Sequence, residues 1–438
     1  MTLSTPSIPP SRAAALTAIE NTLPVNGKSG QDLQGALDNA LRRLADPRDK
    51  GLATELTYGY FRLRGRMEHL VRFHLAKPEK THPLIVRILA LAAYELVVLT
   101  GVPSWASLSW AVDAVKNRFG QTQANVANAV LRRIQALGSE ASQQSFYESS
   151  SHSRLQALCA WYSCPVWLYE LWTQEYGEQD ALELMRCQLL PPVNGIRCNS
   201  AHPDSHACFE TLTCGREILF EQYPWAGFAP GDTNPLLAEV VRLEREGVLS
   251  RQSAAVGDIL TRLGYQSWPG PIWDACCGRG GKTTALMENS TSRVFASDPN
   301  KRRLKGLLAE SVRLGLPRPA LFAADASKPP LSSFDGTILI DAPCSGLGVL
   351  SRRPDTKWKR TRNDIDHLCS IQQSLLASCS SLLRSGGRIV YLTCTMTRQE
   401  NDQQDAFLRS LGLTCEMIAQ PVAGSRLREF FWGGVWKK

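Results

Sequence analysis

Long apolar runs are missing from this chain. The most apolar stretch, residues 84–100, is interrupted by Arg87 and Glu95. It is also shorter than the roughly 20 apolar residues that a membrane-spanning helix needs. We therefore expect a buried helix there and no association with a membrane. The composition is otherwise that of a globular protein, since 43% of the 438 residues are hydrophobic and 21% are charged. A chain of this length is expected to form two or three domains.

Metal-binding patterns are equally scarce. The chain has only 7 histidines, and it contains no Cys-x-x-Cys doublet. Zinc sites usually combine two tight ligand pairs of that kind. The set His202, His206, Cys208 and Cys214 lacks this spacing, so we expect no bound metal there, only buried or exposed thiols.

Cysteine is absent from the first 150 residues, and all 13 cysteines follow them. Their odd number does not suit a complete disulfide framework. Residues 1–12 are polar and rich in Ser, Thr and Pro, without the apolar core of a secretory signal. These features predict a reducing, cytoplasmic environment.

The net charge of +8 is unevenly distributed. Residues 1–150 carry 17 basic and 12 acidic side chains, residues 151–255 carry 7 and 13, and residues 256–438 carry 25 and 16. Two basic regions of this kind could share one polyanion, such as a nucleic acid. Solvated charges scattered over the surface would give the same numbers, so charge alone leaves both interpretations open.

Hydrophobic periodicity divides the chain into three parts, which we expect to be domains at residues 1–145, 146–255 and 256–438. The first has apolar residues at helical spacing throughout and predicts five to seven helices. The second mixes helices, at 155–172 and 180–190, with a short strand at 193–198. Between these two parts, the Ser- and Gln-rich residues 139–153 predict a linker.

The third part alternates short apolar strands with helices. This alternation predicts a parallel sheet covered by helices on both faces. In such sheets ligands bind at the carboxyl ends of the strands, so the residues that follow each strand are the candidates for a functional site. The expected strands are residues 272–276, 294–297, 321–324, 337–341 and 388–393, followed by atypical strands at 413–418 and 430–436.

A glycine-rich turn, Cys276 to Thr283, follows the first of these strands. Such a turn lets backbone N–H groups and a helix N-terminus approach a ligand closely. A Walker A loop would need glycine at Cys276, and a dinucleotide fingerprint would need glycine at Thr283. Both motifs therefore fail, and a nucleoside without a pyrophosphate remains as the ligand.

An aspartate follows each of the next two strands. Asp298 lies about twenty residues beyond the turn, where a carboxylate can accept both ribose hydroxyls. Asp325 is placed to reach an adenine edge. A single aspartate in such a position is more often a helix N-cap. The order glycine turn, Asp and Asp nevertheless predicts a site for S-adenosylmethionine.

Two cysteines follow the fourth and fifth strands, within Asp341-Ala342-Pro343-Cys344-Ser345-Gly346 and Thr393-Cys394-Thr395. Both thiols and the Asp341 carboxyl group should therefore lie over one crevice. Carbon 5 of cytosine is a poor nucleophile until a thiolate adds to carbon 6 while an acid binds the N3 side. A second thiol can help to expel the enzyme afterwards. Free cysteines are also common as small buried residues.

These motifs resemble the RNA cytosine-5 methyltransferases of the Sun/Fmu/NOL family. The resemblance extends upstream to Glu246–Ser253 and Val193–Asn199, and residues 1–140 resemble a NusB-like RNA-binding domain through Thr54–Gly59 and Ala127–Arg133. It implies an all-α NusB-like domain, a small α+β subdomain and an α/β Rossmann-like class I methyltransferase domain. It also implies an S-adenosyl-L-methionine-dependent enzyme with an RNA substrate, small-subunit rRNA, and we expect a monomer.

The resemblance further implies roles for individual residues. Cys394 matches the nucleophile, Asp341 the acid at N3, and Cys344 the thiol that assists product release. Asp298 would hold the ribose, and Asp325 would lie near the adenine. The remaining cofactor contacts that it implies are Cys276, Cys277, Gly278, Arg279, Gly280, Gly281, Lys282 and Arg303, with Asp341 also beside the cofactor.

A basic run follows the first cysteine loop and contains one tryptophan. Such a run offers phosphate contacts and a stacking face for a base, although a solvated loop has the same composition. The expected RNA-binding residues are Arg352, Arg353, Lys357, Trp358, Lys359 and Arg360, with Arg362 beyond them.

The sequence departs from the family pattern at two places, and two rival functions remain open. Gly278-Arg279 stands where family members have Ala-Pro, and Thr395 replaces a serine. One rival is a tRNA cytosine-5 methyltransferase with the same site. The other is a non-catalytic RNA-binding assembly factor whose cofactor site has decayed.

Overall fold

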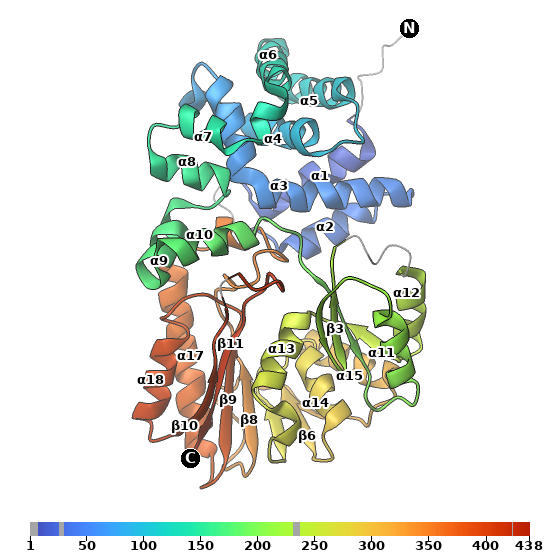
Figure 1. Cartoon of the computed structure of the whole chain (residues 1–438), viewed down its shortest axis with the longest axis vertical. Helices are drawn as coiled ribbons and strands as arrows, with labels where there is room; N and C mark the ends of the chain where they lie inside the picture. The colour runs from blue at the N-terminus through green and yellow to red at the C-terminus, as the bar shows by residue number, and fades with distance from the viewer. Residues whose placement is uncertain (1–7, 26–29, 231–236, 423) are drawn as a thin grey trace. The chain divides into compact units, whose positions relative to one another are not determined.

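The computed structural model describes residues 8–25, 30–230, 237–422 and 424–438. They form two compact units, which we call the helical unit (Met1–Gln174 with Arg353–Lys359) and the sheet unit (Glu175–Arg352 with Arg360–Lys438). Figure 1 draws the chain from blue at the N-terminus to red at the C-terminus. The short segment Arg353–Lys359 is distant in sequence from the rest of the helical unit, yet it packs as part of it.

The helical unit consists of helices throughout its described residues, as the periodicity predicts. Several helices begin at a residue that fits the first turn: Pro10, Pro47 and Pro83 each stand at the first position of a helix, where a missing N–H costs nothing. The helices are α1 (Pro10–Thr22), α2 (Leu33–Leu41), α3 (Pro47–His74), η1 (Pro78–Lys80), α4 (Pro83–Val98), α5 (Ser104–Phe119), α6 (Gln121–Leu137), η2 (Gly138–Ser142), α7 (Gln144–Ser150), α8 (Arg154–Trp161), most of α9 (Val166–Tyr176) and α16 (Thr356–Lys359).

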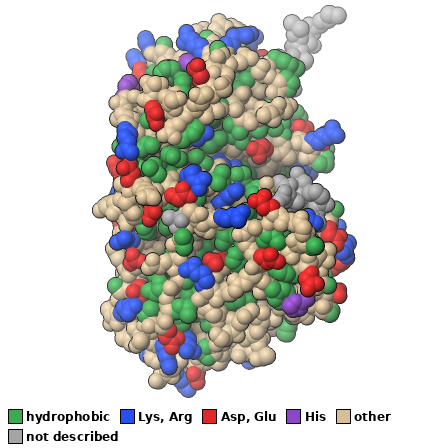
Figure 2. Space-filling model, in the orientation of Figure 1, with side chains coloured by type: hydrophobic (Ala, Val, Ile, Leu, Met, Phe, Trp, Pro, Cys, Tyr) green, Lys and Arg blue, Asp and Glu red, His purple; other side chains and the backbone are tan. Residues whose placement is uncertain are grey.

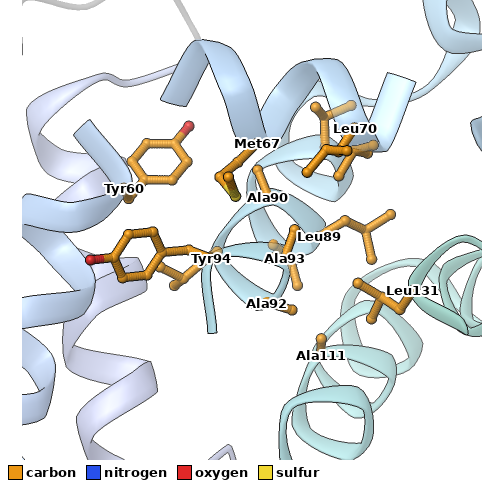
Figure 3. Packing of buried hydrophobic residues seen from close by; sticks show 14 of the residues in the cluster. Tyr60, Met67, Leu70, Leu89, Ala90, Ala92, Ala93, Tyr94, Ala111 and Leu131 are labelled. Carbon is orange, nitrogen blue, oxygen red and sulfur yellow. The ribbon is translucent and has the colours of Figure 1, made fainter. Parts of the chain in front are cut away.

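Helix α4 is the centre of this unit. Every residue from Ile85 to Glu95 is buried, which confirms that the apolar run is a core helix. Figure 3 shows its Leu89, Ala93 and Tyr94 packed among side chains of neighbouring helices. Glu95 is fully buried, and its carboxylate accepts hydrogen bonds from Arg12 (Nε at 2.9 Å) and Ser107 (2.6 Å). These donors offset the cost of burying a charge. Among the described residues, no helix is long and apolar enough to cross a membrane.

Two expectations for residues 139–172 are wrong. The segment 139–153 is not a linker, because it forms η2 and α7, and the fully buried Tyr147 donates a hydrogen bond to the Ala141 carbonyl at 2.9 Å. The helix expected over 155–172 is broken into α8 and α9 (Val166–Tyr176) around Pro165. Proline cannot continue a helix from the residues before it.

The sheet unit contains two sheets. The smaller has the order β2-β3-β1-β4, and the larger has the order β10-β11-β9-β8-β5-β6-β7. Its strands are β1 (Asn194–Cys198), β2 (Ile218–Gln222), β3 (Trp225–Phe228), β4 (Leu249–Arg251), β5 (Ile272–Asp274), β6 (Val294–Ser297), β7 (Ala320–Phe322), β8 (Thr337–Asp341), β9 (Arg388–Thr393), β10 (Thr414–Ala419) and β11 (Trp432–Lys437). Its helices are α10 (Glu178–Cys187), α11 (Ser205–Thr213), α12 (Leu237–Arg245), α13 (Ala254–Arg262), η4 (Tyr265–Ser267), α14 (Gly281–Asn289), α15 (Lys301–Arg313), α17 (Arg362–Leu382) and α18 (Asp402–Ser410).

Alternate residues of the larger sheet face two different layers of helices. Leu339 and Val390 pack in one cluster with residues of α13 and α14, whereas Ile338 and Tyr391 pack in another with residues of α17 and α18. Figure 1 shows α17 and α18 beside β10. The expected multidomain fold, with a helical part and an α/β part built on a sheet covered on both faces, is confirmed.

The strand order places a topological switch point beside β5. The chain runs from β5 outward to β6 and β7, and then returns to β8 on the other side of β5, with all these strands parallel. Beyond β9, which is also parallel to β8, the strands β11 and β10 pair antiparallel. Ligands bind at such switch points, at the carboxyl ends of the strands. The loops after β5, β8 and β9 therefore define the candidate site.

Candidate active site

The turn after β5 has a shape that only glycine adopts easily. Gly278 and Gly280 have φ of 56° and 87°, and a Cβ on Gly280 would lie 2.2 Å from Leu307. A Cβ on Gly278 would meet no atom within 4 Å, so this residue borders open space. Helix α14 begins at Gly281, and its first N–H groups have no partner within the helix. The turn can therefore accept a ligand beside its backbone.

Asp298 closes the turn from the next strand. It is 3% exposed, and its Oδ2 accepts hydrogen bonds from the Gly278 N–H (3.2 Å) and from Arg303 (3.3 Å). Its Oδ1 accepts from the Asn300 N–H at 2.7 Å. A carboxylate so held has a fixed direction beside the open space at Gly278, which suits the binding of ribose hydroxyls.

The other predicted cofactor residues differ in their surroundings. Asp325 is exposed, and its Oδ1 accepts a hydrogen bond from the Ser327 N–H at 2.9 Å, which is the turn-capping role that an aspartate often has. Cys277 packs with Leu304 and Leu307 in the core, whereas Arg279 is exposed on the turn. The Gly278-Arg279 departure thus leaves the glycine turn formed.

Lys282 links the turn to the end of β8. Its Nζ donates a hydrogen bond to Oδ2 of Asp341 at 2.7 Å. Burial alone would lower the pKa of Lys282, but the charge and hydrogen bond of Asp341 raise it above its ordinary value. Nearby, burial raises the pKa of Asp274 to about 7, against the hydrogen bond that it accepts from Thr283. Asp341 is thus held beside a protonated cation at the switch point.

The two predicted thiols lie together. Sγ of Cys344 is 3.2 Å from Sγ of Cys394, and the Cys394 N–H donates to Sγ of Cys344 at 3.3 Å. The hydrogen bond with Cys394, followed by burial, raises the pKa of the Cys344 thiol well above its ordinary value. This shift favours the thiol form of Cys344 over its thiolate. Either sulfur can donate the hydrogen bond that joins the pair.

Glu400 is a member of the site whose function the sequence did not indicate. This residue is fully buried, and its carboxylate accepts hydrogen bonds from Ser345 and Thr395, the residues that follow the two cysteines. The sequence signal was indirect: each cysteine is followed by a hydroxyl residue, and Glu400 stands a few positions beyond the second. Asn401 supports the same loop, because its Oδ1 accepts a hydrogen bond from Thr393 at 2.6 Å.

The basic run is not a free loop. In the helical unit, Lys357 is 1% exposed and its Nζ donates to the Arg62 carbonyl at 3.2 Å. Trp358 donates its indole N–H to the Phe61 carbonyl at 2.7 Å, and Lys359 donates to the Gln31 carbonyl at 2.8 Å. Lys357 is therefore not placed to contact RNA phosphate, which corrects the sequence-based expectation. The Lys357 side chain instead donates its hydrogen bond to a backbone carbonyl of the helical unit.

The arginines of this run remain closer to the surface. Arg353 is exposed. Arg352 donates to the buried Glu429 at 2.8 Å, and Arg360 donates to the Ser345 carbonyl at 3.2 Å. Both of these side chains belong to the sheet unit. Arg352 is itself exposed, whereas Arg360 is half-buried.

Replacing Lys357 with methionine should stabilise the helical unit most at low pH. Burial lowers the pKa of Lys357 to about 7, whereas an unfolded lysine has a pKa of about 10.4. Between these values the unfolded chain binds more protons, so the wild-type stability rises with pH. The gain from Lys357→Met should therefore shrink by up to about 1.4 kcal/mol per pH unit across that range. Urea unfolding of both proteins measures it, with the exposed Lys116 changed to Met as the control; a gain that is independent of pH would contradict the prediction.

The sequence set considered for zinc does not converge. The His206 ring stacks on Tyr223 with centroids 4.0 Å apart, Sγ of Cys208 lies 3.9 Å from Sγ of Cys198, and Cys214 is exposed. Within the described part of the chain, no three metal-ligating side chains form a group that could hold an ion.

Charged side chains of both signs are interspersed over each unit on the face drawn in Figure 2. Elsewhere in the described residues, Arg242 of α12 lies 2.7 Å from Glu239 of the same helix and 2.6 Å from Glu246, which follows it. Such exposed pairs contribute little to stability. This face alone does not present a surface of one sign.

Two stretches of the chain match known protein families. Residues 266–419 match the family described as 16S rRNA methyltransferase RsmB/F, and residues 9–136 match the NusB family. The probable ribosomal RNA small subunit methyltransferase B of Bacillus subtilis (strain 168) is 31% identical over 366 residues, which cover 81% of this chain and 78% of the relative. The ribosomal RNA small subunit methyltransferase B of Shewanella oneidensis is 30% identical over 404 residues, covering 91% and 89%.

Solved structures share the fold. The crystal structure of PH0851 aligns with a TM-score of 0.73 and 20% identity over 99% of this chain and 100% of that one. The structure of NSun6 from Pyrococcus horikoshii, solved with SFG, aligns with a TM-score of 0.52 and 21% identity, covering 63% and 98%.

Proposed function

The chain belongs to the RsmB/F family of S-adenosylmethionine-dependent rRNA methyltransferases, and we propose that it methylates carbon 5 of a cytosine in 16S rRNA through a covalent cysteine adduct. The observation that carries this proposal is the pair of thiols, 3.2 Å apart, at the ends of β8 and β9. The Asp341–Lys282 pair stands at the end of β8 too. A plain methyl transfer to an oxygen or nitrogen atom would need neither thiol.

S-adenosylmethionine fits the residues at the switch point. The backbone from Cys276 to Lys282 would hold its methionine part, since the turn borders open space at Gly278 and leads into a helix N-terminus. Asp298 would accept the ribose hydroxyls, with Arg303 orienting its carboxylate, and Asp325 would lie near the adenine. Bound there, S-adenosylmethionine supplies the methyl group as an electrophile.

Cys394 is the nucleophile in this proposal. Its sulfur forms a bond to carbon 6 of the cytosine, and the electron pair of the 5,6 double bond moves towards carbon 5 and the N3 side of the ring. Asp341 lies at the N3 side. The protonated amine of Lys282 lies 2.7 Å from Oδ2 of Asp341. The pair can therefore provide a proton at the N3 side of the ring, where it offsets the negative charge that develops there. The activated carbon 5 then accepts the methyl group.

Cys344 assists the release step. After methyl transfer, carbon 5 carries one proton too many, and the bond between carbon 6 and Cys394 has to break. A base removes that proton, the double bond re-forms, and the sulfur of Cys394 leaves with its electron pair. The Cys344 thiol, whose pKa is raised by its hydrogen bond with Cys394 and by burial, can donate a hydrogen bond to the departing sulfur across the 3.2 Å gap.

The rest of the chain serves the substrate in this proposal. We assign RNA contacts to Arg352, Arg353 and Arg360, and recruitment of rRNA to the NusB-like domain at 1–145. Residues 146–255 would be a pre-catalytic subdomain before the methyltransferase domain at 256–438. A monomer in the cytoplasm, where rRNA is assembled into subunits, completes the proposal.

The test uses the purified full-length chain and a radiolabelled methyl donor. Unmodified 16S rRNA should become labelled, and bisulfite sequencing of rRNA from a deletion strain should lose one protected cytosine. Label appearing in tRNA instead would favour the tRNA cytosine-5 methyltransferase. If titration calorimetry showed no binding of S-adenosylhomocysteine, the chain would be a non-catalytic assembly factor and the proposed function would be wrong.

A further inference from the structure

The carboxylate of Glu400 is fully buried and accepts five hydrogen bonds, four from side chains and one from a backbone N–H. Ser345 donates its N–H to Oε1 at 2.7 Å and its hydroxyl to Oε2 at 2.6 Å. Gln372 donates to Oε1 at 3.1 Å, and Thr397 donates to Oε2 at 2.9 Å. Burying a charge is costly unless donors of this kind surround it. The cost makes a purely space-filling role for this carboxylate a poor explanation.

The carboxylate joins the two cysteine loops at a single oxygen atom. Ser345 is the residue after Cys344, and Thr395 is the residue after Cys394. Both hydroxyls donate to Oε2 of Glu400, and they also lie 2.6 Å from each other. The position of one loop is therefore tied to the position of the other through Glu400.

Two further hydrogen bonds to backbone carbonyls fix the loops that carry the thiols; together with those of Glu400 we call them the frame of the thiol pair. The Gly348 N–H donates to the Cys394 carbonyl at 2.9 Å. A Cβ on Gly348 would lie only 2.9 Å from that carbonyl oxygen, so the loops already lie as close as the backbone allows. Arg360 donates a hydrogen bond from Nε to the Ser345 carbonyl at 3.2 Å. Glu400 is the member of this frame that contacts both loops through side chains.

We propose that Glu400 is a positioning residue that holds Cys344 at hydrogen-bond distance from Cys394 for the release of methylated RNA. The proposal rests on the covalent route proposed above. Release needs the Cys344 thiol to reach the departing sulfur, whereas the first addition of Cys394 to the ring does not. A displacement of about 1 Å in a reacting group can cost about 10²-fold in rate. Loss of Glu400 should therefore slow release far more than addition.

The experiment follows two rates in a single turnover of the full-length enzyme with 16S rRNA. Formation and decay of the covalent complex are read as a slow band on a denaturing gel. Glu400→Ala should slow decay on the order of 10²-fold and formation by less than about tenfold. Glu400→Gln keeps the shape and one acceptor oxygen, so it should fold even if the alanine variant does not, and its decay should be slowed to an intermediate extent.

Two matched variants separate positioning from general loss of stability. Glu95→Gln alters another fully buried carboxylate with several donors, in the helical unit, and should leave the ratio of decay to formation at its wild-type value. Combining Glu400→Ala with Cys344→Ala should give the decay rate of Cys344→Ala alone, because Glu400 acts through Cys344.

The outcomes distinguish the two proposals. If Cys344→Ala accumulates the adduct but Glu400→Ala and Glu400→Gln release RNA at the wild-type rate, the positioning role is overturned while the covalent route stands. The positioning role is also overturned if the covalent complex of the double variant decays more slowly than that of Cys344→Ala by the full factor that Glu400→Ala produces on its own. If Cys344→Ala forms no adduct at all, the covalent route fails and the positioning role fails with it.

Discussion

Replacing Cys394 with alanine should abolish methyl transfer to rRNA. The variant lacks the sulfur that adds to carbon 6, so carbon 5 stays unreactive, and the rate should fall by at least about 10³-fold, as for other lost nucleophiles. Binding of S-adenosylhomocysteine should not change, because Cys394 follows β9 whereas the glycine turn and Asp298 follow β5 and β6. Transfer of labelled methyl groups and titration calorimetry measure the two effects.

Cys415→Ala is the matched control for this variant. Cys415 is another partly exposed thiol of the sheet unit, in β10, and it contacts neither cysteine loop through any hydrogen bond described for it. Its replacement should keep wild-type activity. Substantial transfer by Cys394→Ala would mean that no cysteine adduct forms at this residue, and the assignment of the nucleophile would be wrong.

Replacing Cys344 with alanine should have a different effect: RNA should stay attached to the protein. Addition and methyl transfer need Cys394, which is intact, but the departing sulfur loses the thiol that lies 3.2 Å away. We expect turnover to fall by about 10²-fold or more and a slow band to appear on a denaturing gel after incubation with rRNA and the methyl donor.

The double variant Cys344→Ala with Cys394→Ala is the control for that band. It should form no attached RNA, because the bond requires Cys394. A band of equal strength from the double variant would show that another residue holds the RNA. Free product released at the wild-type rate by Cys344→Ala would remove Cys344 from the mechanism.

The order of strands and helices in the methyltransferase part was predictable from the sequence, because short-range hydrophobic patterns determine it. Apolar strands of three to six residues alternate with helices, and parallel strands bring their carboxyl ends together. The positions of Cys344 and Cys394 after β8 and β9 were therefore enough to expect the thiols in one crevice. The 3.2 Å separation between the two sulfur atoms required the structure.

The wrong expectations came from composition without tertiary context. Residues 139–153 look like a linker because Ser and Gln are common in linkers, but Tyr147 and Ala141 are buried and hold the segment against the helices. Lys357 looks like a phosphate ligand for a similar reason. Its burial depends on the Arg62 carbonyl, 295 residues away in the chain, which no local pattern can reveal.

Glu400 illustrates the same limit in the site itself. Its function depends on Ser345 and Gln372, which lie 55 and 28 residues away in the sequence. Long-range contacts of this kind carry no periodicity.

Peptide mapping of the complex trapped by Cys344→Ala tests the central claim most directly. After digestion of the protein and the RNA, tandem mass spectrometry identifies the residue that still carries a nucleotide and the base in that nucleotide. The account predicts a methylated cytidine nucleotide bonded to Cys394. A nucleotide on any other residue, or a trapped base other than cytosine, would contradict it.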